Sequence, residues 1–215
     1  MLNRITSLTV ATTFLCAVPL QSARAVVPSD SLMPPSTVGY ASIADLTTLS
    51  DQFAQTQLGH LVEDDAMRPF VQDMKRQLQR KLSSVRDKLG LELGDLKGVA
   101  SGEVALGMIE QEGDRAAVLM TVDITGRHAE AQELLVKAEQ ELVQRNAKKR
   151  TAERGPIKFT MFDIPPKTAQ DVPREAIFFI YDDMLIGSDD QTVAEELLGR
   201  WSGKSDSGLA GVEAY

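Results

Sequence analysis

Cysteine and histidine are scarce in this 215-residue chain. The one cysteine, Cys16, lies in an apolar stretch near the N-terminus, and His60 and His128 fall in different predicted elements with no other ligand at metal-binding spacing. Internal disulfides, thiolate metal sites and a cysteine nucleophile are therefore excluded from the rest of the chain. Capping and the helix dipole already explain a solitary histidine at a helix end. We expect no metal site and no cofactor.

Known catalytic motifs are also missing. The sequence holds no G-x-S-x-G elbow, no glycine-rich phosphate loop and no H-E-x-x-H. The acids Asp182, Asp183, Asp189 and Asp190 lack the alternating spacing of a calcium loop. Turns and helix starts recruit aspartate for local backbone reasons, so we interpret the first pair as a hairpin turn and the second as the start of a helix. We assign no catalytic residue from motifs.

Long apolar runs are limited to the N-terminus. Arg4 is followed by an apolar stretch from Ile5 to Leu20 and then by Ala23, Arg24 and Ala25. This order is typical of a secretory signal peptide, and the stretch is too short and too rich in Ser and Thr to span a bilayer. We predict cleavage after Ala25 and an exported mature chain, periplasmic or secreted, without a transmembrane segment.

The charge balance is acidic. The formal charge of −8 becomes 21 − 31 = −10 when residues 1–25, with two arginines and no acid, are removed. This sign repels phosphate backbones and favours solubility. Nucleic acid and anionic membranes are therefore not expected as partners of the whole molecule.

Composition divides the mature chain into three segments. Residues 26–37 contain three prolines and several serines, which predict an extended tether. Residues 38–201 carry the periodic patterns of one domain. Residues 202–215 are a flexible tail or the start of a missing element, because the apolar residues Leu209, Val212 and Tyr215 return just before the sequence stops. We expect the chain to be an N-terminal fragment of a longer protein.

Apolar periodicity predicts an α+β fold. Strand-like segments are expected near residues 38–44, 103–110, 116–124, 157–164, 175–181 and 184–188, mostly as hairpins. Helices are expected over residues 45–57, 66–89, 128–147 and 190–201. The long helix 66–89 has an apolar stripe and ends at Gly90. These patterns favour a mostly antiparallel sheet packed on one face by this long amphipathic helix and the further helices.

The predicted helix 66–89 has a basic outer face. It carries seven Lys and Arg residues against Asp73 and Asp87, a local excess of 7 − 2 = +5 in an acidic protein. A solvated helix face commonly has this appearance, but the excess also suits docking of an acidic protein partner or of an acidic face on a second copy. A second basic cluster comprises Lys148, Lys149, Arg150 and Arg154.

Several phrases in order carry a family resemblance: YASI, FAQTQLGHLVEDDAMRPFVQDM, LGLELGDLKGVASGEVALGMI, VLMTVDITGR and DDMLIGSDDQTVAEELLGRW. Together they resemble the N-terminal part of bacterial exported proteins of the domain-of-unknown-function family numbered 3352, over roughly Val38 to Tyr215. The family has no established activity, so the resemblance implies export and no site residue.

Three functions stay open. The leading hypothesis is a non-enzymatic exported module acting in binding or envelope structure. The second is an extracytoplasmic hydrolase whose acids meet only in the fold, with Glu103, Asp123 and Asp163 as candidates. The third is a carrier of an apolar ligand, with adaptable walls from methionines. The five methionines considered are Met67, Met74, Met108, Met120 and Met161.

Overall fold

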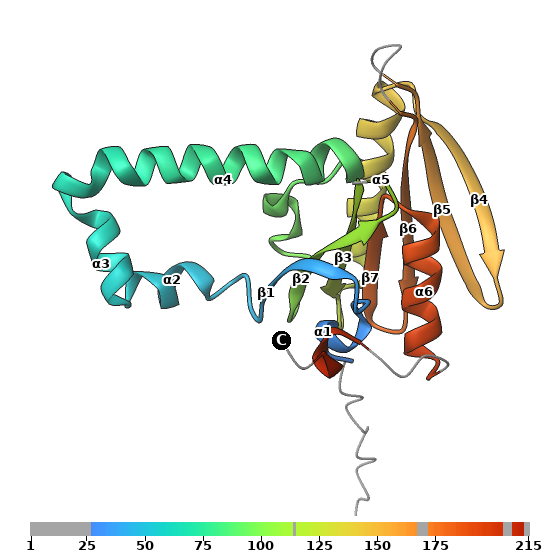
Figure 1. Ribbon diagram of the computed structural model, residues 1–215, viewed down its shortest axis with the longest axis horizontal. Helices are drawn as coiled ribbons and strands as arrows, with labels where there is room; N and C mark the ends of the chain where they lie inside the picture. The colour runs from blue at the N-terminus through green and yellow to red at the C-terminus, as the bar shows by residue number, and fades with distance from the viewer. Residues whose placement is uncertain (1–26, 114, 167–171, 204–207, 213–215) are drawn as a thin grey trace, which may run out of the picture.

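A computed structural model describes residues 27–113, 115–166, 172–203 and 208–212 (Figure 1). Within the helices, some side chains are also left undescribed, including those of Leu78 and Leu82 in the predicted apolar stripe. Residues 1–26 lie outside the described ranges, so the signal peptide and its cleavage after Ala25 stay predictions. No helix in the described ranges combines the length and apolarity needed to cross a membrane.

A seven-stranded sheet forms the body of the protein, and every neighbouring pair in it is antiparallel. The strand order is β1-β2-β3-β7-β6-β5-β4, so two consecutive meanders meet where β3 pairs with β7. The strands are β1 (Thr37–Ile43), β2 (Val104–Gln111), β3 (Arg115–Asp123), β4 (Lys148–Arg154), β5 (Ile157–Ile164), β6 (Arg174–Tyr181) and β7 (Met184–Ser188). The α+β class and the antiparallel hairpins are confirmed.

Helices connect and flank the strands. The α-helices are α1 (Ser29–Leu32), α2 (Leu49–Ala54), α3 (Gln57–Glu63), α4 (Arg68–Leu89), α5 (His128–Gln144) and α6 (Gln191–Trp201). Short 3-10 helices are η1 (Asp65–Met67), η2 (Leu93–Leu96) and η3 (Leu209–Gly211). The predicted helix over residues 45–57 is wrong in its bounds, because Asp45 accepts hydrogen bonds from Thr47 in a turn and the helix starts later. The strand β4, which contains the second basic cluster, was not predicted.

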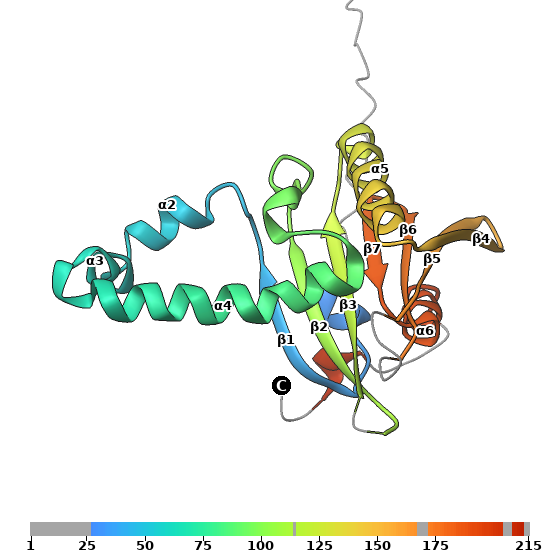
Figure 2. The ribbon, with the colours of Figure 1, turned by 90° about the horizontal axis from the view of Figure 1, so that it is seen from above.

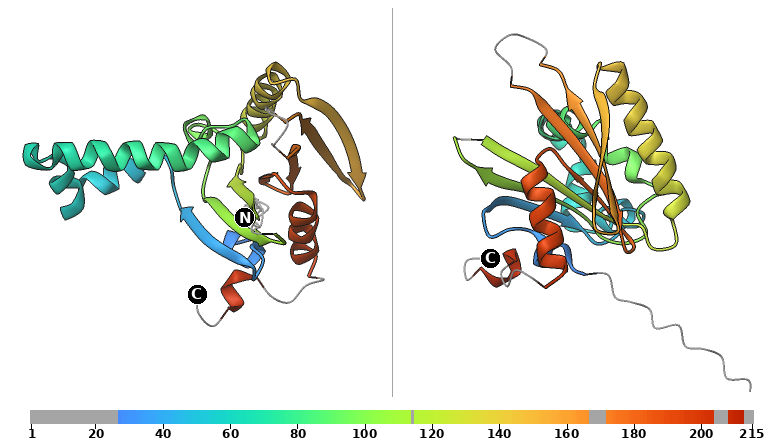
Figure 3. Two further views of the ribbon diagram at one scale, coloured as in Figure 1. Left: turned by 45° about the horizontal axis from the view of Figure 1, so that its top comes forward. Right: turned by 90° about the vertical axis from the view of Figure 1, so that its right-hand side faces the viewer.

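The sheet is covered on both faces, which corrects the expectation of a single covered face. Alternate residues of the central strands point to opposite sides, so Met120 and Leu119 belong to different cores. One core includes α5 and the C-terminal end of α4, and the other includes α1, α6 and η3. Figure 3 shows α5 and α6 on opposite sides of the strands.

The expected tether does not exist as an extended segment. Residues Ser29–Leu32 form α1, and Leu32 and Met33 are almost fully buried in the second core. The amide of Leu209 in η3 donates a hydrogen bond to the Met33 carbonyl. Two apolar side chains in succession outweigh the extended preference of the flanking prolines, since their burial is favourable.

Among the side chains that the structure describes, those of α4 that join a core of the body lie near its C-terminal end, which corrects the expectation that the helix lies along the sheet. Val85 and Leu89 pack in the core that includes α5, whereas Phe70 and Met74 are 61% and 44% exposed. Figures 1 and 2 show that the chain leaves the sheet beyond β1 through α2 and α3, and that α4 returns beside them to the body. We call residues 49–89, from α2 to α4, the arm.

Candidate functional site

The three candidate catalytic acids do not meet. Glu103 accepts hydrogen bonds from the Ser29 amide and the Tyr40 hydroxyl, while Asp123 accepts one from the Thr125 amide in a turn. Asp163 pairs with Arg150 across the β4–β5 hairpin at 2.9 Å. Asp123 is level with Tyr181 of β6 in the strand register, whereas Asp163 pairs with Glu175, six residues away along β6. Asp123 and Asp163 are therefore roughly 20 Å apart along the strand direction.

The other predicted groups have structural roles. Asp182 turns the β6–β7 hairpin with φ of 50°, and Asp190 caps α6 by accepting a hydrogen bond from the Val193 amide at 3.0 Å. Asp183 lies 2.8 Å from the ring of His128. His60 lies in α3, where its side chain is exposed. Among the described residues, no cluster of His, Cys, Asp and Glu could hold a metal ion.

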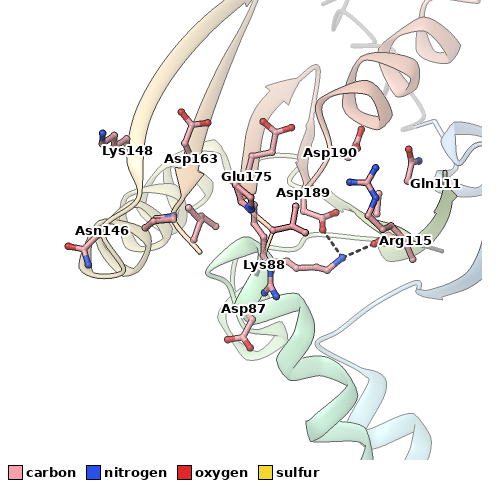
Figure 4. A pocket seen from close by; sticks show the side chains of 17 residues that line it. Asp87, Lys88, Gln111, Arg115, Asn146, Lys148, Asp163, Glu175, Asp189 and Asp190 are labelled. Atoms are coloured by element: carbon pink, nitrogen blue, oxygen red, sulfur yellow. Dashed lines mark hydrogen bonds and ion pairs between the residues drawn. The ribbon is translucent and has the colours of Figure 1, made fainter. Parts of the chain in front are cut away.

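A polar pocket of about 910 Å³ opens at one end of the sheet (Figure 4). It lies where the short strand β7 ends at Ser188, while its neighbours β3 and β6 continue. In the gap, Asp189 Oδ1 accepts a hydrogen bond from the Val118 amide at 2.5 Å. Lys88 Nζ donates to the Ala116 carbonyl at 2.8 Å. These two side chains bind backbone groups of β3 that lie beyond the end of β7.

Lys88 and Asp189 also pair with each other. Their Nζ and Oδ2 atoms lie 2.6 Å apart, and the two side chains are only 22% and 12% exposed. Because Lys88 is in the last turn of α4 and Asp189 follows β7, the pair fixes the arm to the centre of the sheet. Leu89, fully buried, and Gly90, which ends the helix with φ of 68°, complete this attachment.

The pocket holds charges of both signs that are largely engaged. Glu175 accepts hydrogen bonds from Arg150 at 2.8 Å and from the Gln191 amide at 3.0 Å. Asp163 also pairs with Arg150. One guanidinium, that of Arg150, therefore holds both carboxylates in ion pairs.

The five methionines do not line a common cavity. Met120 and Met161 are buried in different cores on opposite faces of the sheet. Met74 lies on the arm and Met108 is 53% exposed on β2. The apolar pocket beside Met120 has a volume of about 10 Å³, which corresponds to about one water molecule.

The arm exposes an unusual concentration of apolar side chains. Six large ones within 26 residues are 39–61% exposed, and they come from all three α-helices of the arm. Single exposed apolar residues are normal, whereas several on one projecting element make it a candidate interaction surface. The six are Leu49, Phe53, Leu58, Leu61, Phe70 and Met74.

The basic face of α4 is partly neutralised by its surroundings. Three of its cations pair with acids outside the helix, since Arg68 pairs with Asp65, Arg86 with Glu92 and Lys88 with Asp189. Counting these acids reduces the local excess from +5 to 7 − 5 = +2. The side chains of Lys75 and Lys81 lie outside the described part. The exposed apolar side chains are therefore the stronger feature of the arm.

Sequence reasoning missed both the pocket and the arm surface. The stripe containing Phe70 and Met74 was recognised, but periodicity gives no information on what covers a stripe. The pocket depends on β7 being shorter than its neighbours, and the only local signal was the pair Asp189 and Asp190 directly after that strand.

Comparison with known proteins gives no assignment. No protein-family model matches this sequence, and neither the curated proteins nor the solved structures include one with significant similarity to it. The resemblance to exported proteins of the family numbered 3352 stays a prediction.

Proposed function

We propose that this chain is an exported, non-enzymatic binding module of the cell envelope that contacts a protein partner through the arm. The supporting observation is the group of six apolar side chains, 39–61% exposed, on an element that projects from the body. A group of exposed apolar side chains promotes aggregation of a protein that is alone in solution. It therefore favours a partner that covers these side chains.

The partner is expected to be a protein with an apolar surface surrounded by acidic groups. The arm retains positive charge on α4, and its ion pairs, such as Arg76 with Asp73, are exposed. Exposed pairs contribute little stability, so these cations can exchange intramolecular partners for intermolecular ones at small cost. Apolar contacts would supply affinity, and the cations would steer association.

The alternatives have weaker support. A hydrolase would have to use the polar pocket, where Asp163 and Glu175 face each other across β5 and β6 but share Arg150. A carrier of an apolar ligand would need an apolar cavity of about 300 Å³ or more. The apolar pocket beside Met120 provides about 10 Å³.

A comparison of two double variants tests the proposal. Phe70→Ser with Met74→Ser removes two of the exposed side chains from the arm, and Val136→Ser with Val143→Ser removes two similarly exposed side chains from α5. Each protein is purified under mild conditions from the extracytoplasmic fraction, and the proteins that accompany it are quantified by mass spectrometry. We expect an acidic protein to accompany wild type and the α5 variant and to be depleted from the arm variant. Equal recovery with all three proteins, together with equal self-association of the three, would contradict the proposal.

A further inference from the structure

The two edges of the sheet differ sharply in their protection. The edge strand β4, KKRTAER, has five charged residues in seven, whereas the edge strand β1, TVGYASI, has no charge and no proline. Charged side chains on an edge prevent it from pairing with another chain. Among the described residues, β1 pairs with β2 alone. The β1 edge is therefore chemically suited to accept a further strand.

The sheet face next to β1 is also incompletely covered. Ala41 is opposite Leu106 in the register, so both face the core that includes α5 and the end of α4. On this face Ala41 is exposed, and Met108 is 53% exposed.

The helix α4 extends over the space beyond β1. Phe70, Met74, Val85 and Leu89 are separated by four, eleven and four residues, which places them on one helical face. The face packs in the core at Val85 and Leu89 and is exposed at Met74 and Phe70. The seventeen residue steps from Arg68 to Val85 span about 25 Å, or about five strand spacings. Figure 2 shows α4 crossing the β1 edge and continuing beyond it.

We propose that β1 of a second copy of this chain pairs antiparallel with β1, so that the sheet continues across a two-fold axis and each α4 covers the edge strands of the other copy. This inference rests on the proposed binding function of the arm and identifies the bound protein as a second copy of the chain. Edge pairing satisfies the backbone groups of β1, and the exposed Met108 and Ala41 of one copy come to lie beneath the apolar face of the other copy's α4.

A second copy provides both a strand that can pair with the β1 edge and an acidic surface that can face the basic α4. It presents the same uncharged edge, and a two-fold axis makes one surface complementary to itself. Its charge is also suitable, because α4 keeps a local excess of +2 after its ion pairs, whereas the chain as a whole carries −8. Each α4 would lie over the acidic body of the partner copy.

Self-association of matched edge variants tests the inference. The background is the full chain with Cys16→Ser, which removes the one cysteine. Ala41→Lys places a charge on the β1 edge, and Thr151→Lys places the same charge on β4, and both positions are exposed. By sedimentation velocity over micromolar to millimolar concentrations, we expect a dimer that Ala41→Lys weakens at least about tenfold and Thr151→Lys leaves unchanged.

A cysteine scan gives the pairing geometry independently of Ala41→Lys. Single cysteines are introduced at positions 38–43, and disulfide-linked dimers are quantified after mild oxidation. Pairing about a two-fold axis predicts a maximum at one position and a decline on both sides of it, because only residues near the axis face their own copies. A monomer at every concentration would overturn the inference, as would a dimer that Ala41→Lys leaves intact. A monomer that still binds an acidic protein through Phe70 and Met74 would overturn this inference alone and leave the proposed function standing.

Discussion

The attachment of α4 to the sheet makes Asp189→Ala the most informative stability variant. Asp189 joins Lys88 at 2.6 Å and the Val118 amide at 2.5 Å, and its side chain is 12% exposed. Removing the carboxylate leaves the Lys88 ammonium with the Ala116 carbonyl alone and orphans the Val118 N–H. Breaking a fully buried pair costs about 3–5 kcal/mol. Because a fifth of the Lys88 side chain reaches solvent, we expect a loss of about 2–3 kcal/mol in the free energy of unfolding.

Urea unfolding followed by circular dichroism measures this loss, and the neighbouring acid supplies a control. Asp87 is 48% exposed and lies 4.0 Å from Arg145, so Asp87→Ala is expected to change stability by about 0.5 kcal/mol or less. Replacing both partners, Lys88→Met with Asp189→Leu, is expected to recover most of the loss, because no charge is then left buried. Equal destabilisation by Asp189→Ala and Asp87→Ala would refute the assigned role of the pair.

Three further predictions concern packing, pH and export. Leu89 is fully buried, so Leu89→Ala is expected to lower the free energy of unfolding in urea by about 2–5 kcal/mol. The Met74 side chain is 44% exposed, so Met74→Ala is expected to lower it by about 0.5 kcal/mol or less. Similar losses for the two variants would contradict the described attachment of α4. Burial tends to raise the pKa of Asp95, but hydrogen bonds from Lys137 and the Glu92 amide lower it overall, and the same contact raises the pKa of Lys137. The Asp95 contribution is therefore present above its unfolded pKa of about 3.9 and lost as pH falls through the lowered folded value, and the Lys137 contribution is lost as pH rises above about 10.4. The stability difference between wild type and Asp95→Asn should thus shrink in acid, and a difference constant down to pH of about 2 would refute this. Intact mass of the exported protein should show cleavage after Ala25, and an exported species that still carries residues 1–25 would contradict it.

Local periodicity was sufficient for the elements whose neighbours in sequence are also neighbours in space. The hairpin of β2 and β3 and the helix α5 follow from alternation and from helical spacing, because turns such as that at Gly113, with φ of 78°, are encoded locally. The end of α4 at Gly90 was predictable for the same reason. In these elements, the residues that determine the secondary structure lie within a few positions of one another in the sequence.

The remaining features depend on contacts between distant segments. The strand β4 is mostly charged and becomes a strand because it pairs with β5 through seven residue pairs, a tertiary effect that overrides its low intrinsic preference. Leu32 and Met33 come directly before two prolines and are buried only because the sheet, α6 and η3 surround them. The stripe of α4 looks the same in sequence at Phe70, where it is exposed, and at Leu89, where it is buried.

The central claim, that the arm is a protein-binding surface, is tested most directly by site-specific photo-crosslinking in living cells. A photoreactive amino acid is placed at Phe70 of the arm in one strain and at Val136 of α5 in another, two positions that are 61% and 54% exposed. We expect a discrete crosslinked protein species from position 70 and none from position 136. Equal crosslinking at the two positions, or none at position 70, would contradict it.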